Sequence, residues 1–541
     1  MSAPPRELVA QVQRAIQALQ GGHAAAAEAA CTQLLARFPD SIDGWRLLGH
    51  ARLAQDDAAT AAEALARAEA LSPGDPRTVF ALGTALLQSG EAGRAFEPLQ
   101  QAMRAMPDEP LAAFRYGTCA YALQRFEAAK AGFEAATRLQ PAWPEAWNNL
   151  AATLGRLEDH DAAIAAARRA LQLRPDANAL EALAVLLVNR FDAPSLQEGL
   201  QLIAHALRLA PRMAKAHLTA ALLLRKTGDL RQAEHHARQA RELAPADVET
   251  AEILGELQLL QGKADAAIQT YEQASAEGVE SPILARQLGI ALLQDGQPEA
   301  AVAQLDADLR KRPGDQRTIA HLGAALEVLG RHDEAERLLG MHRHVRSVRI
   351  LPPEGFDDDA AFRAALADDI RRHSRQRWEP AGLAARNAYL SGDLLADRTP
   401  AIVGFEQRLR EAIDAYIAAC EPDADDAMLS AIPRRYRLHV WATQADARGF
   451  IDTHIHEESW LSGAYYVELP ASIRDDDPAH AGWIEFGRPP LALSPVPDTA
   501  LRLTCPTPGT LLLFPSYLFH RTLPFPGDGE RISISFDLAA I

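Results

Sequence analysis

Hydrophobic positions in the first two-thirds of the chain return with a helical spacing inside a longer period. Prolines occur every 34 residues, at Pro39, Pro73, Pro107, Pro141 and Pro175. Between them, small and large apolar residues return at fixed places, as in Trp45, Leu48, Gly49, Ala61, Leu65 and Ala68 and then in Leu82, Gly83, Ala95, Leu99 and Ala102. Small residues let two helices approach closely, large ones fill the space between them, and the proline ends the second helix. The pattern therefore predicts helical hairpins stacked into an α-solenoid.

This 34-residue unit resembles the tetratricopeptide repeat. The resemblance runs from about residue 7 to residue 341 in about ten units, and we assign residues 1–345 to the repeat superhelix. Arrays of this family usually hold an extended peptide or a helix of another protein, which implies a protein or peptide partner in the repeat groove. A spacer or a dimerisation surface is the alternative role.

The pattern changes at residue 346, and we expect residues 346–430 to form a linker and the supporting helices of a second domain. An extended entry is predicted at 350–353 and helices at 360–373 and 400–419, the latter from apolar residues spaced near 3.6. The preceding basic run contains His342 and His344. Cationic side chains at a helix C-terminus explain that pair better than metal binding does.

Residues 431–541 contain short apolar segments separated by glycine and proline turns. The expected strands are 436–442, 463–469, 483–486, 510–514 and 531–538. Several short strands with such turns are typical of a jelly-roll, or double-stranded β-helix. The fold class is therefore multidomain α plus β, with an N-terminal α-solenoid and a C-terminal double-stranded β-helix core.

Composition and charge narrow the choice of partners. The formal net charge is -17, and an acidic surface repels both nucleic-acid phosphates and anionic lipids, so we expect neither nucleic acid nor membrane as a partner. The four cysteines lie far apart without a CxxC pair, which is typical of isolated thiols. We find no signal-peptide pattern and no long apolar run, so a cytoplasmic protein is expected.

Polar residues in the β region form a candidate metal site. His454 and His456 occupy positions i and i+2, which share one face of a strand, and His520 follows a later strand. Three protein ligands leave octahedral positions open for a chelating cosubstrate and oxygen, which is the non-haem iron arrangement. Arg531 offers a charged fork suited to a carboxylate, and Ser533 faces the same way.

The order of these motifs resembles a bacterial and phage family of 2-oxoglutarate-Fe(II) oxygenases, whose members often carry tetratricopeptide repeats. The resemblance covers about residues 350–541 and depends on His454-Ile-His456, Leu461-Ser-Gly-Ala-Tyr-Tyr466, Gly509 to Ser516, His520 and Arg531-Ile-Ser533. It implies Fe(II), 2-oxoglutarate as cosubstrate and O2, with His520 as distal iron ligand. It also implies that Arg531 and Ser533 bind the 5-carboxylate of 2-oxoglutarate.

One departure concerns the proximal ligands. The broader superfamily has His-x-Asp or His-x-Glu, whereas this chain has His454-x-His456 and the overlapping His456-x-Glu458. We favour His454, His456 and His520 as the catalytic iron ligands. Glu458 remains an alternative, because with His456 and His520 it would restore two histidines and one carboxylate.

The expected function is that of a dioxygenase that hydroxylates a protein side chain recruited by the repeats. 2-Oxoglutarate would be decarboxylated to succinate and CO2. The alternatives are an oxygenase acting on a small molecule and a non-catalytic repeat scaffold with a degenerate barrel.

Overall fold

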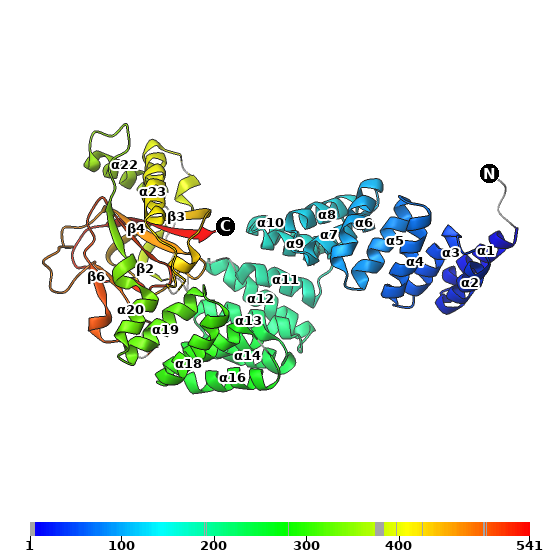
Figure 1. The fold of residues 1–541 in the computed structure, drawn as a ribbon, viewed down its shortest axis with the longest axis horizontal. Helices are drawn as coiled ribbons and strands as arrows, with labels where there is room; N and C mark the ends of the chain where they lie inside the picture. Colours follow the sequence, from blue (N-terminus) through cyan, green and yellow to red (C-terminus); the bar gives the residue numbers. More distant parts are fainter. Residues whose placement is uncertain are drawn as a thin grey trace. The chain divides into compact units, whose positions relative to one another are not determined.

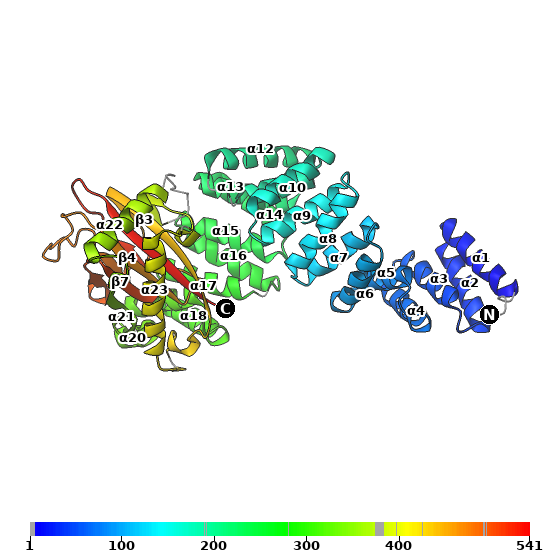
Figure 2. The same cartoon turned by 90° about the horizontal axis from the view of Figure 1, so that it is seen from above.

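The computed structural model describes residues 6–541 except 189, 191, 280, 374–383, 397, 425, 491, 492 and 494. The chain divides into two compact units. One comprises Met1–Arg190 and Gln197–Pro211, and the other comprises Phe191–Leu196 and Arg212–Ile541. Figures 1 and 2 show their elements in chain order. None of the helices in the described ranges is long and apolar enough to cross a bilayer.

The first unit consists of successive helices. They are α1 (Arg6–Gln20), α2 (Ala24–Arg37), α3 (Ile42–Leu53), α4 (Ala58–Leu71), α5 (Pro76–Gln88), α6 (Ala92–Ala105), α7 (Pro110–Ala122), α8 (Phe126–Leu139), α9 (Pro144–Arg156), α10 (His160–Leu173), α11 (Ala177–Val188) and most of α12 (Ala193–Leu209). A small residue on the first helix of a repeat leaves space for a large side chain of the second helix. At Gly83 on α5, for example, an added Cβ would lie only 2.7 Å from Cγ of Leu99 on α6. The predicted solenoid is confirmed.

The second unit begins with helices of the same kind. They are α13 (Ala214–Thr227), α14 (Leu230–Leu243), α15 (Val248–Leu260), α16 (Ala264–Ala276), α17 (Pro282–Gln294), α18 (Pro298–Lys311), α19 (Gln316–Val328), α20 (His332–Leu339) and the short α21 (Met341–His344). Here α13, α15, α17 and α19 each contact the next in that series as well as their own partner. These four helices therefore form the inner row of the stack.

The β region follows in the same unit. Its strands are β1 (Arg346–Arg349), β2 (Ala385–Leu390), β3 (Tyr436–Ile451), β4 (Leu461–Glu468), β5 (Ile484–Phe486), β6 (Arg502–Thr504), β7 (Thr510–Pro515), β8 (His520–Thr522) and β9 (Arg531–Ala540). They form a six-stranded sheet in the order β1-β7-β4-β9-β3-β2 and a three-stranded sheet in the order β6-β5-β8. This confirms the double-stranded β-helix, and it adds the unpredicted strands β1, β2, β6 and β8. The first strand lies just before the extended entry expected at 350–353.

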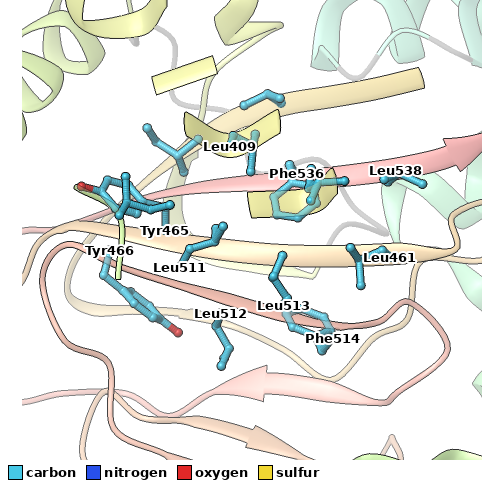
Figure 3. Close-up of a cluster of buried hydrophobic side chains, with 14 of the residues drawn as sticks. Leu409, Leu461, Tyr465, Tyr466, Leu511, Leu512, Leu513, Phe514, Phe536 and Leu538 are labelled. Atoms are coloured by element: carbon cyan, nitrogen blue, oxygen red, sulfur yellow. The ribbon is translucent and has the colours of Figure 1, made fainter. Parts of the chain in front are cut away.

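Two helices, α22 (Asp359–His373) and α23 (Pro400–Ala418), contribute to the largest core cluster together with the six-stranded sheet. The ring of Phe405 on α23 lies 5.1 Å from that of Tyr465 on β4. The next residue, Tyr466, points to the opposite side of the strand (Figure 3). Both tyrosines are buried, so each packs on its own face of β4.

Within the second unit, the inner row of repeat helices packs against the β region. The rings of His321 on α19 and Phe519 are 5.2 Å apart, and Arg317 pairs with Glu457 at 3.4 Å. The hydroxyl of Tyr517 donates to the carbonyl of Leu339 at 3.0 Å. A single apolar cluster joins α15, α17 and α19 to Leu493, Val496 and Phe519. The last repeats therefore form part of the body that carries the β-helix.

Candidate active site

Three histidines meet at one end of the β-helix. His454 and His520 form an isolated antiparallel bridge, in which each backbone N–H donates to the other carbonyl at 3.1 Å. Directly opposed side chains lie on the same face of such a pair, and the two rings are 4.2 Å apart. The N–H of His456 donates to the carbonyl of Ser516 at 3.0 Å, which places its ring 4.8 Å from that of His454.

The residues between these histidines point the other way. Ile455 and Phe519 both belong to the apolar cluster that includes α15, α17 and α19. Because side chains alternate along extended backbone, packing of these two residues against the repeats holds His454, His456 and His520 toward the interior of the β-helix. The repeat helices thus support the segments that carry the histidines.

Hydrogen bonds fix the orientation of two of the three rings. Nδ1 of His454 lies 2.9 Å from the carbonyl oxygen of Asp452, and Nδ1 of His520 lies 2.9 Å from that of Leu518. A carbonyl only accepts, so each Nδ1 carries the proton and each Nε2 keeps its lone pair. Nδ1 of His456 lies 2.8 Å from the carboxylate of Asp537, which likewise favours a proton on Nδ1.

One candidate ligand atom from each histidine lies within 4.8 Å of the others, and no other group of three or more His, Cys, Asp or Glu side chains in the described parts of the chain meets this condition. Burial, and secondarily the charge of His456, lowers the pKa of His454 to about 3. Burial and the two neighbouring histidines lower the pKa of His520 well below its ordinary value. Neutral imidazole is the form that binds metals, so the three side chains can hold a metal ion.

Glu458 lies outside this group. Its side chain is exposed, and it lines a second cavity of about 290 Å³, which shares His456 and Asp537 with the cavity that the three histidines line. The earlier pair, His342 and His344, lies elsewhere: Nε2 of His344 bonds to Asp426 at 2.8 Å.

Arg531 and Ser533 lie on β9 and line the same cavity of about 620 Å³ as the three histidines. The Arg531 side chain is 6% exposed, and burial lowers the pKa of its guanidinium. The Cζ atom of Arg531 lies 5.7 Å from the centre of the Tyr466 ring. Among the described side chains no carboxylate pairs with Arg531. A buried cation that lacks an anion is suited to a carboxylate ligand, so this residue fits one end of 2-oxoglutarate.

The neighbouring arginine has a different role. Arg521 pairs with the buried Glu485 at 2.6 Å, and it does not line the cavity. Because side chains alternate along a strand, Arg521 lies on the opposite face of β8 from His520.

The sequence analysis missed Asp537 and Ser462. The hydroxyl of Ser462 donates to Asp537 at 2.6 Å, and the two residues pair across β4 and β9. A signal for Asp537 was present, because it follows Arg531 and Ser533 at even spacing and so shares their face of the strand. No comparable signal marks Ser462, because its partner depends on the register between strands.

The fold and the site define a protein with a tetratricopeptide solenoid and a jelly-roll that carries a histidine cluster. Comparison with family models agrees with this class. Residues 439–537 match the family described as "Putative 2OG-Fe(II) oxygenase". Residues 25–145 match the tetratricopeptide domain of cytochrome c-type biogenesis protein H, and residues 144–177 and 218–280 match tetratricopeptide-repeat models. The chain therefore combines tetratricopeptide repeats with a domain of the 2OG-Fe(II) oxygenase type.

Solved structures similar to this chain include tetratricopeptide-repeat proteins. The Cut9–Hcn1 hetero-tetramer of APC/C matches with 15% identity and a TM-score of 0.39, over 56% of this chain and 63% of that chain. A repeat protein from Parabacteroides merdae matches with 18% identity and a TM-score of 0.39, over 46% and 97%. TTC0263 from Thermus thermophilus matches with 28% identity and a TM-score of 0.32, over 34% and 100%. No curated protein matches the chain.

Proposed function

We propose that the chain is an Fe(II)/2-oxoglutarate-dependent dioxygenase in which His454, His456 and His520 bind the iron. The observation that carries this proposal is the convergence of three imidazoles on the cavity that also contains the unpaired guanidinium of Arg531. A metal site beside a buried carboxylate-binding cation suits a cosubstrate that chelates the metal at one end and carries a carboxylate at the other.

Each residue has a defined task in this proposal. His454 and His520, held neutral by burial, and His456 donate lone pairs and leave the remaining coordination positions open. Arg531 and Ser533 hold the 5-carboxylate of 2-oxoglutarate. When bound, iron and 2-oxoglutarate supply O2 activation and hydroxylation, with succinate and CO2 as co-products. Phe450, Ile484 and Phe514 contribute apolar walls to the cavity, and such walls would limit the access of water to the reacting groups.

We propose a protein side chain as the substrate, recruited by the repeats. Support comes from Ile455 and Phe519, which connect the histidine-bearing segments to the inner row of repeat helices. Because the β region already covers part of α15, α17 and α19, the partner would use other parts of the array. A small-molecule substrate is the second candidate, favoured by the cavity lining, which comes entirely from residues of the β region and its linker among those described.

The test is succinate formation by anaerobically Fe(II)-loaded protein after addition of 2-oxoglutarate and O2. We expect turnover in the parent and a loss of at least about 100-fold in His520→Ala and Arg531→Ala. Arg521→Ala is the matched control, because this neighbouring arginine does not line the cavity, and it should retain turnover. A parent that binds no iron and forms no succinate would instead indicate a non-catalytic scaffold.

The substrate class is tested with the same assay. Fractions of a cell extract above and below a membrane cut-off are added separately, and stimulation of succinate formation is measured. Stimulation by the protein fraction alone agrees with a protein substrate, whereas stimulation by the filtrate alone contradicts it.

We further propose that the enzyme acts in the cytoplasm and that its domain boundaries lie near residues 345 and 430. Support for the first boundary is that β1, at Arg346–Arg349, already pairs with β7 of the oxygenase sheet.

A further inference from the structure

His456 differs from the other two histidines in the group that faces its Nδ1. His454 and His520 each contact a backbone carbonyl there, whereas His456 contacts the carboxylate of Asp537 at 2.8 Å. A carboxylate beside a ligand imidazole orients the ring and makes it a stronger donor to a metal. The contact therefore bears on metal affinity as well as on packing.

Two serines hold this carboxylate in place. The hydroxyl of Ser462 donates to Asp537 Oδ1 at 2.6 Å and lies 2.8 Å from the hydroxyl of Ser516. An ionised carboxylate only accepts, so Ser462 uses its proton on Asp537 and must accept from Ser516. Both serines are buried, at 1% and 0% exposure, which limits competition from water.

The contacts form a closed ring around His456. The backbone N–H of His456 donates to the carbonyl of Ser516, the Ser516 hydroxyl donates to Ser462, Ser462 donates to Asp537, and Asp537 contacts the His456 ring. The same network thus holds the main chain and the side chain of His456, and in the described parts of the chain neither His454 nor His520 has an equivalent.

We propose that Asp537 is a positioning residue that orients His456 toward the metal. It also supplies the negative charge that a three-histidine site lacks, by contacting a ligand and not the metal itself. The inference rests on the proposed function, because it assumes a metal at His454, His456 and His520. In the broader superfamily a carboxylate contacts the iron directly. Here the carboxylate of Asp537 stands behind a ligand instead, with Oδ1 engaged by Ser462 and Oδ2 facing His456.

The test is titration of the metal-free full chain with Co(II), followed through its visible absorption. We expect Asp537→Asn to weaken Co(II) binding about 10-fold and Asp537→Ala up to about 100-fold. The spectrum of each saturated variant should keep the parent's shape, because the number of ligands is unchanged. Ser462→Ala, which leaves the carboxylate but removes its hydrogen bond, should weaken binding by less than Asp537→Ala.

Glu458→Gln is the matched control. It removes the same charge from another residue that lines the 290 Å³ cavity beside Asp537, and it should bind Co(II) as the parent does. Thermal midpoints of the metal-free proteins show whether each variant is folded. If Asp537→Ala does not fold, the Co(II) affinities of Asp537→Asn and Ser462→Ala test the inference.

Three outcomes would overturn the inference while leaving the proposed function intact: parent-like affinity in folded Asp537 variants, equal weakening in Glu458→Gln, or a spectrum whose shape changes with Asp537. A parent that binds no Co(II) would overturn the proposed function, and this inference with it.

Discussion

Contacts within the repeat helices and contacts within the β region join residues at very different separations along the chain. In the repeats, the hollows at Gly83 and Gly289 are each filled from half a repeat further on, by Leu99 and by Leu305. In the β region, Ser462 bonds to Asp537 across 75 residues. A destabilising substitution in a repeat should therefore destabilise mainly the adjacent repeats, whereas one in a central strand should destabilise the whole sheet.

The largest expected effect comes from Gly463→Ala in β4, which lies between β7 and β9. A Cβ there would lie 2.4 Å from the carbonyl oxygen of Leu512 and 2.4 Å from Cε1 of Phe536. The carbonyl belongs to the neighbouring strand and cannot rotate away. We expect a loss of at least about 3 kcal/mol in the free energy of unfolding of the second unit, measured by denaturant titration with proteolysis to assign the unit.

Gly83→Ala in α5 is the control for this comparison. Its Cβ would meet mainly the side chain of Leu99, at 2.7 Å, which can shift, and alanine favours the helix by about 1 kcal/mol. The net loss should be about 1 kcal/mol or less and confined to the first unit. Equal losses at the two positions would show that the two regions do not differ as described.

Phe519→Ala should have the next largest effect. The ring is 5% exposed and joins the repeats to the β region beside His520. We expect a loss of about 3 kcal/mol, the lower end for this substitution, because two packed layers can close partly over the gap. Co(II) affinity should fall as well, since Phe519 holds the segment that carries His520.

Phe96→Ala is the matched substitution in the first unit, where the ring is 6% exposed. It should cost a similar amount of stability in that unit but leave Co(II) affinity unchanged. Weaker metal binding in Phe96→Ala, or unchanged binding in Phe519→Ala, would contradict the role given to the repeats of the second unit.

The difference in sequence separation between contacting residues also explains how much of the fold could be predicted. The repeats were predictable because their contacts recur in sequence, so glycine, leucine and proline return together. Strands β3, β4, β7 and β9 were predictable from their apolar runs. In contrast, β1 has the sequence RSVR and β8 has three residues. Neither contains an apolar run, and both form because distant strands offer hydrogen-bonding edges.

The candidate site divides in the same way. Spacing alone placed His454 with His456, and Arg531 with Ser533, on shared faces. The contact between Asp537 and His456 could not be derived from spacing, because it depends on how β9 lies beside the segment that carries His456. Likewise, no pattern in the sequence indicated that Phe519 packs against α19, because the contact joins two regions with independent periodicities.

Acidification should destabilise the contact between α19 and the β region, because this contact contains a buried histidine. His321 on α19 is buried against Phe519, and burial, then the charge of Arg317, lowers its pKa to about 3. In the unfolded chain its pKa is about 6.5, so between these values the unfolded state binds the extra proton. Stability should fall as pH drops below 6.5, by at most about 1.4 kcal/mol per pH unit for this group.

His321→Gln removes this contribution and leaves those of the other buried histidines. The free energy of unfolding of the second unit is measured at pH 7 and pH 5 in parent and variant. The variant should lose less stability than the parent on acidification, and equal losses would contradict the assignment to His321.

The smallest effect comes from removing one hydroxyl in each region. Tyr271 fills the hollow at Gly255 in the repeats, and among the described residues no group makes a hydrogen bond to its buried hydroxyl. Tyr416 in α23 donates to the carbonyl of His344 at 2.8 Å. Removing an unpaired buried hydroxyl relieves its desolvation, whereas removing a paired one leaves a carbonyl unsatisfied. By denaturant titration, Tyr271→Phe should therefore be neutral or more stable by up to about 1 kcal/mol, and Tyr416→Phe should be less stable by about 1 kcal/mol. A loss of stability in Tyr271→Phe as large as that in Tyr416→Phe would contradict this prediction, because it would mean that the hydroxyl of Tyr271, and not only the size of its ring, stabilises the repeat.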